Sequence, residues 1–127
     1  MRRAYQHALA NLNERIAPLG VSPMQFSILV RLQDDGSWTQ NSLGRSMLMQ
    51  PANIAALVRR LAERGLVTRA PDPDDRRAVR VSITQEGRDL LASVRPVADA
   101  ANAQTLSVLE PVEREQLMEL LQRLAAG

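Results

Sequence analysis

The clearest pattern of apolar and polar positions in this chain lies between residues 50 and 65. Its apolar residues recur at the spacing i, i+3, i+4 and i+7, which places them on one face of an α-helix. They are Ile54, Leu57, Val58 and Leu61. Pro51 suits the first position of a helix, and Gly65 suits the position just after its end. The pattern predicts a helix that starts at Gln50 or Pro51 and closes at Gly65.

Apolar stripes at helical spacing also predict helices before and after this one. Ser22, with Gln25 three positions later, forms a capping box, and Thr39 and Thr84 are good N-caps. Pro96 lies inside the fifth helix and is expected to kink it. The predicted helices are residues 2–17, residues 23 to about 34, residues 40 to about 47, residues 85 to about 108, and a last helix from Pro111 onward.

Alternating apolar and polar residues predict two short strands, residues 66–69 and residues 78–83. Between them, residues 71–77 read Pro-Asp-Pro-Asp-Asp-Arg-Arg, which cannot pack in a core and should project. Residues 37–39 form either a brief strand or the entry to the next helix. The expected fold is mainly α with a small β-hairpin (α+β), in which the hairpin separates four helices from two.

Gly44 falls inside the predicted helix at residues 40–47, where a glycine costs about 1 kcal/mol relative to alanine. In a helix-turn-helix, a small residue at this position lets the following helix approach closely. That requirement explains why a glycine is tolerated there.

The composition of the 127 residues sets limits on the class of protein. The length indicates one domain, and a hydrophobic content of 45% is that of a folded globular chain. The absence of cysteine excludes disulfides, thiolate chemistry and zinc sites built on Cys. No apolar run approaches the roughly 18 residues of a membrane span, and residues 1–10 lack the apolar segment of a signal peptide. We therefore expect a cytoplasmic protein with no membrane contact.

Charge is unevenly distributed although the net charge is only +2. Residues 45–80 carry eight arginines against four acids, whereas residues 81–127 carry four arginines against seven acids. All sixteen basic residues are arginine, which binds phosphates and base edges in bidentate fashion better than lysine does. A GC-rich genome explains the exclusive use of arginine equally well. The basic middle of the chain is the part that favours a nucleic-acid partner.

The helix after Gln50 has an outer face that suits a DNA groove. Small residues lie near its start, and Arg59 and Arg60 lie further along. A recognition helix places its first half in the major groove, where small residues fit, and its arginines then reach phosphates. An ordinary solvated helix with two arginines explains the same pattern, so this helix alone does not decide the function.

The tip of the predicted hairpin carries Arg76 and Arg77. The minor groove concentrates negative potential and attracts guanidinium groups, so a projecting tip of this kind suits it. Asp75 lies beside these arginines and is expected to hold a guanidinium by bidentate pairing. The alternative is a turn whose acidic and basic residues neutralise each other. Because the preceding helix also suits DNA, we favour the interpretation of the hairpin as a DNA-binding wing.

Leucines line helices at both ends of the chain, and we expect them to pack against a second copy of the chain. Packing of the last helix on the first helix of the same chain is the alternative, and both arrangements can coexist. The leucines expected at the dimer interface are Leu9, Leu12, Leu117, Leu120, Leu121 and Leu124.

Candidates for other chemistry are few. Tyr5, His7 and Phe26 are candidates for a small-molecule pocket, and the alternative for Tyr5 and His7 is a surface or interface pair. One histidine, no cysteine, and no paired carboxylates or glycine-rich phosphate loop argue against an enzyme. We expect no cofactor and no metal site.

Three segments of the chain resemble the MarR family of bacterial transcription regulators. Residues 57–67, Leu-Val-Arg-Arg-Leu-Ala-Glu-Arg-Gly-Leu-Val, look like the end of the family's recognition helix and its first wing strand. Residues 72–78, Asp-Pro-Asp-Asp-Arg-Arg-Ala, look like its wing, and residues 81–87, Val-Ser-Ile-Thr-Gln-Glu-Gly, look like its second strand and the start of the next helix. The order of elements matches over essentially the whole chain. The wing motif is fairly specific, and the flanking helices are not.

The resemblance implies a winged helix-turn-helix homodimer with a DNA-binding core at residues 22–84 and dimerisation helices at residues 1–20 and 85–127. Such a dimer binds double-stranded DNA at a pseudo-palindromic operator whose half-sites lie about one turn, ~34 Å, apart. It further implies a repressor that responds to a small effector, often aromatic or phenolic. A winged-helix module that binds an acidic protein partner is the alternative function.

By the family pattern, Arg77 enters the minor groove, with Arg76 beside it and Asp75 as its support. Thr39, the cap of the preceding helix, is expected at the same DNA face. The recognition-helix residues expected to contact bases or phosphates are Gln50, Pro51, Ala52, Asn53, Ala56, Arg59 and Arg60. Many members have Arg at the position of Ala56, and Ser or Thr at those of Gln50 and Asn53, so fewer direct hydrogen bonds to bases are expected. The absence of cysteine excludes the thiol sensing used by some members.

Overall fold

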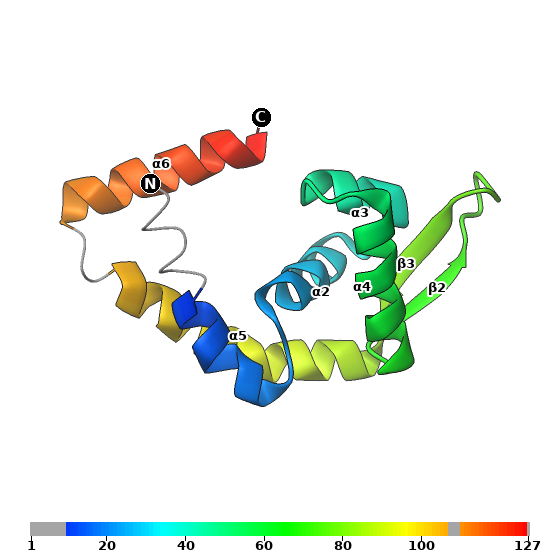
Figure 1. Ribbon diagram of the computed structural model, residues 1–127, viewed down its shortest axis with the longest axis horizontal. Helices are drawn as coiled ribbons and strands as arrows, with labels where there is room; N and C mark the ends of the chain where they lie inside the picture. The colour runs from blue at the N-terminus through cyan, green and yellow to red at the C-terminus, as the bar shows by residue number, and fades with distance from the viewer. Residues whose placement is uncertain (1–9, 107–109, 127) are drawn as a thin grey trace.

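The computed structural model describes residues 10–106 and 110–126, and these residues form a mainly helical molecule with one small antiparallel sheet (Figure 1). Residues 10–16 are helical and lead into a short 3₁₀ helix. The elements that follow are η1 (Ala17–Leu19), α2 (Pro23–Asp35), β1 (Ser37–Thr39), α3 (Gln40–Ser46), α4 (Pro51–Glu63), β2 (Val67–Pro71), β3 (Val79–Ile83), α5 (Gln85–Leu106) and α6 (Pro111–Ala126). The predicted order of elements and the mainly α class are confirmed.

The predicted helix starts are confirmed in their capping geometry. Ser22 and Gln25 form both hydrogen bonds of a capping box at the start of α2. The Thr39 hydroxyl accepts the Ser42 N–H at 3.2 Å at the start of α3, and the Thr84 hydroxyl accepts the Gly87 N–H at 3.0 Å in the first turn of α5. Because these side chains bind N–H groups that have no partner within the helix, they fix where each helix begins.

The sheet has the strand order β1-β3-β2, so the third strand lies between the other two. Residues 37–39, whose prediction was left open, form an edge strand in which Trp38 pairs with Val81. The β2 strand runs two residues beyond its predicted end, because Ala70 pairs with Arg80 and Pro71 pairs with Val79. A proline is compatible with pairing at this position because β2 is also an edge strand.

The main core lies where α2, α3 and α4 meet the sheet and the start of α5. The predicted inner face of α4 is confirmed, since Ile54, Val58 and Leu61 are fully buried there and Leu57 packs against them. Gly44 is also buried, and α4 passes directly over it. The helix-turn-helix made by α3 and α4 is therefore a tightly packed pair.

A second, smaller cluster joins the first helix to the middle of α5. Ile16, Val94 and Ala98 are fully buried in it, and the Asn11 side-chain amide donates to the Ala101 carbonyl at 2.9 Å. The α5 helix contains Pro96 and changes direction along its length in Figure 1, as expected for a proline inside a helix. Its predicted extension to residue 108 lies outside the described residues.

The α6 helix begins at Pro111, as predicted, and Figure 1 shows it apart from α2, α3, α4 and the sheet. No residue of α6 belongs to either hydrophobic cluster of the residues that the structure describes. Val112 on α6 is 64% exposed. Among the α6 side chains that the structure describes, none therefore packs into the core of this chain.

Candidate nucleic-acid interface

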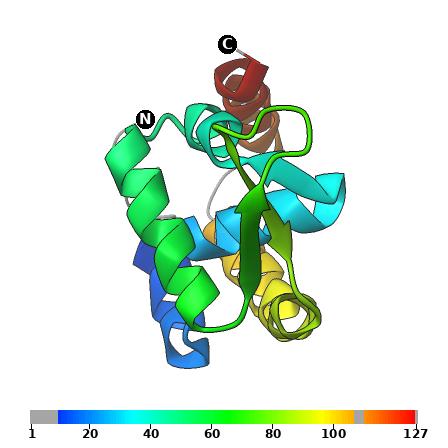
Figure 2. The ribbon, with the colours of Figure 1, turned by 90° about the vertical axis from the view of Figure 1, so that its right-hand side faces the viewer.

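The α4 helix and the β2–β3 hairpin lie on the same side of the molecule (Figures 1 and 2). Figure 2 views this side directly and shows the hairpin beside α4. The buried face of α4 fixes which residues face outward. The exposed residues that the sequence assigned to DNA recognition are Gln50, Pro51, Ala52, Asn53, Arg59 and Arg60, and Ala56 is half-buried. All of the predicted reading residues except the half-buried Ala56 are therefore accessible, at the N-cap and along α4.

Gln50 is the N-cap residue of α4, but its side chain makes no capping hydrogen bond. The first turn of α4 contains no acidic residue. The start of α4 thus presents N–H groups and an exposed amide, and the helix dipole adds a partial positive charge there. This end of the helix is electrostatically suited to approach a polyanion.

The α3 helix adds polar residues to the same part of the molecule. The Thr39 hydroxyl donates to Ser42 Oγ at 2.8 Å, and the exposed Arg45 guanidinium donates to the same oxygen at 3.1 Å. A hollow of about 370 Å³ lies between α3 and the start of α4, and Asn41 and Arg45 line it. Sequence reasoning identified Thr39 but missed Arg45, whose place beside α4 depends on how the two helices pack.

The tip of the hairpin is a short, closed turn between β2 and β3. Its base is closed by two backbone hydrogen bonds, from Asp72 N–H to Ala78 O at 3.0 Å and from Ala78 N–H to Asp75 O at 2.9 Å. Arg76 and Arg77 lie between these bonds and are both exposed. The predicted projection of this loop is confirmed for the residues at its tip.

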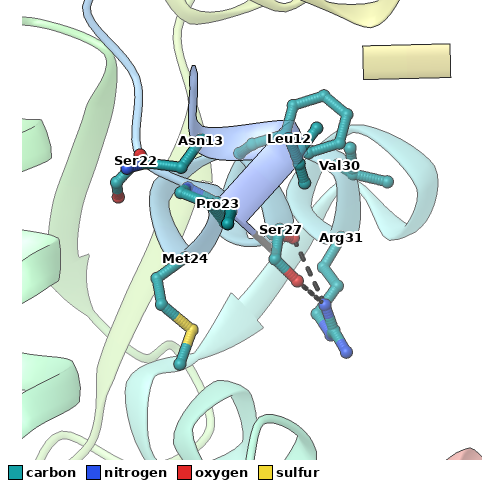
Figure 3. Close-up of a pocket in the computed structure, with 10 residues that line it drawn as sticks. Leu12, Asn13, Ser22, Pro23, Met24, Ser27, Val30 and Arg31 are labelled. Carbon is teal, nitrogen blue, oxygen red and sulfur yellow. Dashed lines mark hydrogen bonds between the residues drawn. The ribbon is translucent and has the colours of Figure 1, made fainter. Parts of the chain in front are cut away.

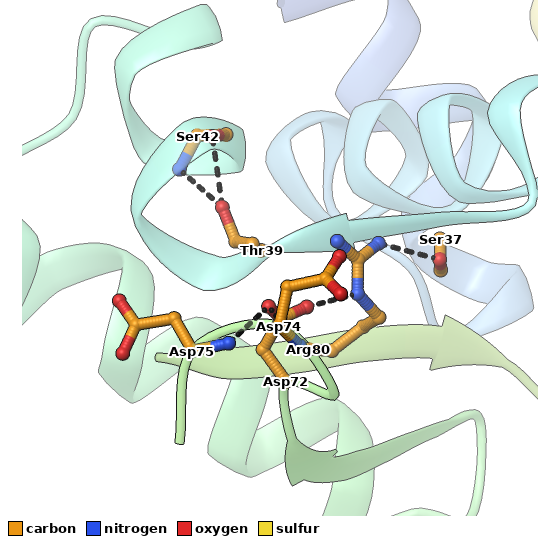
Figure 4. A network of polar contacts seen from close by, with 7 residues as sticks. All are labelled: Ser37, Thr39, Ser42, Asp72, Asp74, Asp75 and Arg80. Carbon is orange, nitrogen blue, oxygen red and sulfur yellow. Dashed lines mark hydrogen bonds and ion pairs between the residues drawn. The ribbon is translucent and has the colours of Figure 1, made fainter. Parts of the chain in front are cut away.

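Asp72 departs from the expectation that nothing in this loop packs. It is only 5% exposed, and its carboxylate is bonded on both oxygens (Figure 4). Oδ1 accepts from Arg80 Nε at 2.6 Å, and Oδ2 accepts the backbone N–H groups of Asp74 and Asp75 at 3.2 and 3.0 Å. The hydrogen bond from Arg80 lowers the pKa of Asp72 below its ordinary value of 3.8, against the opposing effect of desolvation.

Asp75 supports Arg77 in a different way from the one predicted. Its Oδ1 accepts the Arg77 backbone N–H at 3.0 Å, so it holds the main chain at the tip. The ion pair described in the wing joins Asp72 to Arg80 instead. Sequence reasoning missed this pair because Asp72 and Arg80 lie eight residues apart, on opposite sides of the turn.

A cavity of about 720 Å³ lies between the first helix and α2 (Figure 3). The described residues that line it are largely apolar and include one charged side chain, that of Arg31, which donates to the Ser27 hydroxyl. Phe26, predicted for a small-molecule pocket, lines this cavity. The other lining residues are Ala10, Leu12, Asn13, Ser22, Pro23, Met24 and Val30. Tyr5 and His7 lie outside the described residues.

The leucines predicted for a dimer interface divide into three groups. Leu12 lines the cavity and packs against the small cluster on α5, so part of its surface is covered by its own chain. Leu117 and Leu120 on α6 are half-buried. Leu9 and the side chains of Leu121 and Leu124 lie outside the described residues.

Two further findings concern membrane spans and metal sites. Within residues 10–106 and 110–126, no helix is long and apolar enough to cross a membrane. The same residues contain no group of three or more His, Cys, Asp or Glu side chains that could hold a metal ion.

The fold and the sequence both match known regulators. The MarR family model matches residues 21–79, and the HTH-type transcriptional repressor NicR of Pseudomonas putida is 32% identical over 98% of this chain and 78% of its own length. The structure of a probable transcriptional regulator from Pseudomonas aeruginosa has 41% identity and a TM-score of 0.86, with 97% of this chain and 92% of that chain covered. The chain belongs to the MarR family of transcriptional regulators.

A second solved structure adds information about partners of a relative. The structure of Bordetella bronchiseptica BpsR concerns the regulation of its DNA binding by 6-hydroxynicotinic acid. It is 30% identical to this chain, with a TM-score of 0.88, and covers 99% of this chain and 90% of that one. The winged helix-turn-helix fold predicted from the sequence is confirmed by these matches.

Proposed function

We propose that this protein is a homodimeric transcriptional repressor that binds a pseudo-palindromic site in double-stranded DNA and responds to a small molecule. The observation that carries the proposal is the placement of the exposed side of α4 beside a hairpin whose exposed tip holds Arg76 and Arg77. The helix suits the major groove, and the arginine tip suits the adjacent minor groove. The relatives named as a repressor and as a DNA-binding regulator support this function.

The proposal of a dimer rests on α6 and on the first helix. Because no described α6 side chain packs into either hydrophobic cluster and Val112 is exposed, a second copy is the simplest partner. The dimerisation helices would be residues 1–20 and 85–127, outside the DNA-binding core at residues 22–84. A two-fold dimer presents two recognition helices, which is why we propose a pseudo-palindromic site with half-sites about 34 Å apart.

The proposal of ligand control rests on the cavity between the first helix and α2. Its largely apolar lining includes the ring of Phe26, and Arg31 offers a cation. These features suit a small aromatic or phenolic molecule. BpsR, whose DNA binding 6-hydroxynicotinic acid regulates, supports an effector of this kind.

Selection of bound duplexes from a random pool tests the proposed function. We expect one enriched site with two-fold sequence symmetry. Affinity for that duplex should fall log-linearly with salt concentration, because each phosphate contact releases condensed counterions. Enrichment of no duplex above the starting pool would contradict DNA binding and would favour the alternative, a winged-helix module for protein–protein contact.

A further inference from the structure

The wing contains three aspartates close to the surface that should meet DNA, at positions 72, 74 and 75. Carboxylates at such a surface repel phosphates, so their presence calls for a compensating role. Of the three, only Asp72 is buried, and its two oxygens accept three hydrogen bonds within the wing. The role of this carboxylate is therefore found inside the wing.

A continuous chain of hydrogen bonds leads from β1 to the tip of the wing. Arg80 Nη1 donates to the Ser37 hydroxyl of β1 at 2.8 Å, while its Nε donates to Asp72. Asp72 then binds the N–H group of Asp75, and Asp75 binds the N–H group of Arg77. Figure 4 shows the Ser37, Arg80, Asp72 and Asp75 part of this chain.

From the sequence alone, Arg80 is a candidate for DNA contact, because it lies on a wing strand in the basic part of the chain. The structure gives it another role. Its side chain is only 34% exposed, and its guanidinium is bonded to Ser37 on one side and Asp72 on the other. Ser37 lies 43 residues away along the chain, so Arg80 connects the wing to the strand that leads into α3.

We propose that Asp72 and Arg80 are positioning residues for DNA binding, and that their ion pair, anchored to Ser37, holds the wing tip in the conformation that presents Arg77 to the minor groove. This inference rests on the proposed DNA-binding function. A wing held in this way loses less conformational freedom when it binds, which favours affinity. Neither residue needs to contact DNA for this effect.

The Asp72→Asn variant tests the proposal because two effects have opposite signs. Removal of a negative charge near DNA should by itself leave binding unchanged or strengthen it. Loss of positioning should weaken binding, and we expect a loss of about tenfold for the duplex selected from a random pool. Asp74→Asn is the matched control, since it makes the same charge change at an exposed residue. Asp74 contributes only its backbone N–H to the hydrogen bonds around Asp72.

A double-mutant cycle with Arg77→Ala separates positioning from general destabilisation. If Asp72 acts through Arg77, then Asp72→Asn should change affinity by less than about twofold in the Arg77→Ala background. An equal loss in both backgrounds would show a structural role only and would overturn the proposal. Ser37→Ala removes only the hydrogen bond that joins Arg80 to β1 and should weaken binding by a smaller factor. This variant provides a second test if Asp72→Asn does not fold.

These binding measurements also distinguish a failure of the proposed function from a failure of the positioning role. Failure of the wild-type protein to bind any duplex would refute the proposed function. Tight wild-type binding that Asp72→Asn leaves unchanged or strengthens would refute the positioning role alone.

Discussion

A Cβ atom placed on Gly44 of α3 would lie 2.9 Å from Cγ2 of Ile54 on α4. This separation is below the normal contact distance between carbon atoms. Ile54 is fully buried and β-branched, so its side chain cannot easily rotate away. The spacing between the two helices of the helix-turn-helix therefore depends on the missing side chain of Gly44.

Gly44→Ala should destabilise the protein although alanine is the better helix former. The helix-propensity gain is about 1 kcal/mol. The overpacking cost should exceed that gain, and we expect a net loss of about 1–2 kcal/mol in the free energy of unfolding, measured by urea denaturation. In an Ile54→Ala background, which removes Cγ2, the same substitution should no longer destabilise. A stabilising effect of Gly44→Ala in the wild-type background would contradict this account of the helix spacing.

Leu48 in the turn between α3 and α4 has a left-handed backbone, with φ of 55°, and is 93% exposed. A leucine in this conformation is strained, and almost none of its side chain is buried in compensation. Leu48→Gly should raise the free energy of unfolding by about 1 kcal/mol, after allowance for the greater freedom of glycine in the unfolded chain. Leu48→Ala retains the Cβ atom and should have little effect. Equal thermal shifts for the two variants would argue against strain at this position.

The lowered pKa of Asp72 predicts a specific dependence of stability on pH. A carboxyl group whose pKa is lower in the folded state stabilises the fold above its unfolded pKa, and this contribution is lost as pH falls through the folded value. The stability difference between wild type and Asp72→Asn should therefore be largest above pH 3.8 and should shrink as pH falls below it. Urea denaturation of both proteins from pH 7 to pH 3 measures this difference. A difference that grows in acid would contradict the assigned pKa direction.

Local signals in the sequence were enough to predict the helices from α2 to α6 and where each of them begins. The apolar spacing of α4, the capping box at Ser22 and the caps at Thr39 and Thr84 each act within one or two helical turns. Gly87 belongs to the motif that marks the start of α5, and the structure supplies the reason. A Cβ atom there would lie 2.2 Å from the Leu66 carbonyl oxygen.

Contacts between distant segments could not be read from the same signals. The bond between Arg80 and Ser37 depends on the pairing of β1 with β3, and the sequence left β1 undecided. The cavity depends on the packing of the first helix beside α2, so Phe26 could be proposed for it but Arg31 could not. The support of Arg77 through its backbone depends on the geometry of a single turn.

The most direct test of the central claim is the affinity of Arg77→Ala for the duplex selected by the wild-type protein. We expect the affinity to fall by much more than about tenfold, because a dimer carries two wings and each would lose its minor-groove arginine. Arg123→Ala, which removes an exposed arginine from α6, is the matched control and should bind as the wild type does. Sedimentation should show both variants as dimers. An affinity of Arg77→Ala equal to that of Arg123→Ala would contradict the assignment of the hairpin as a DNA-binding wing.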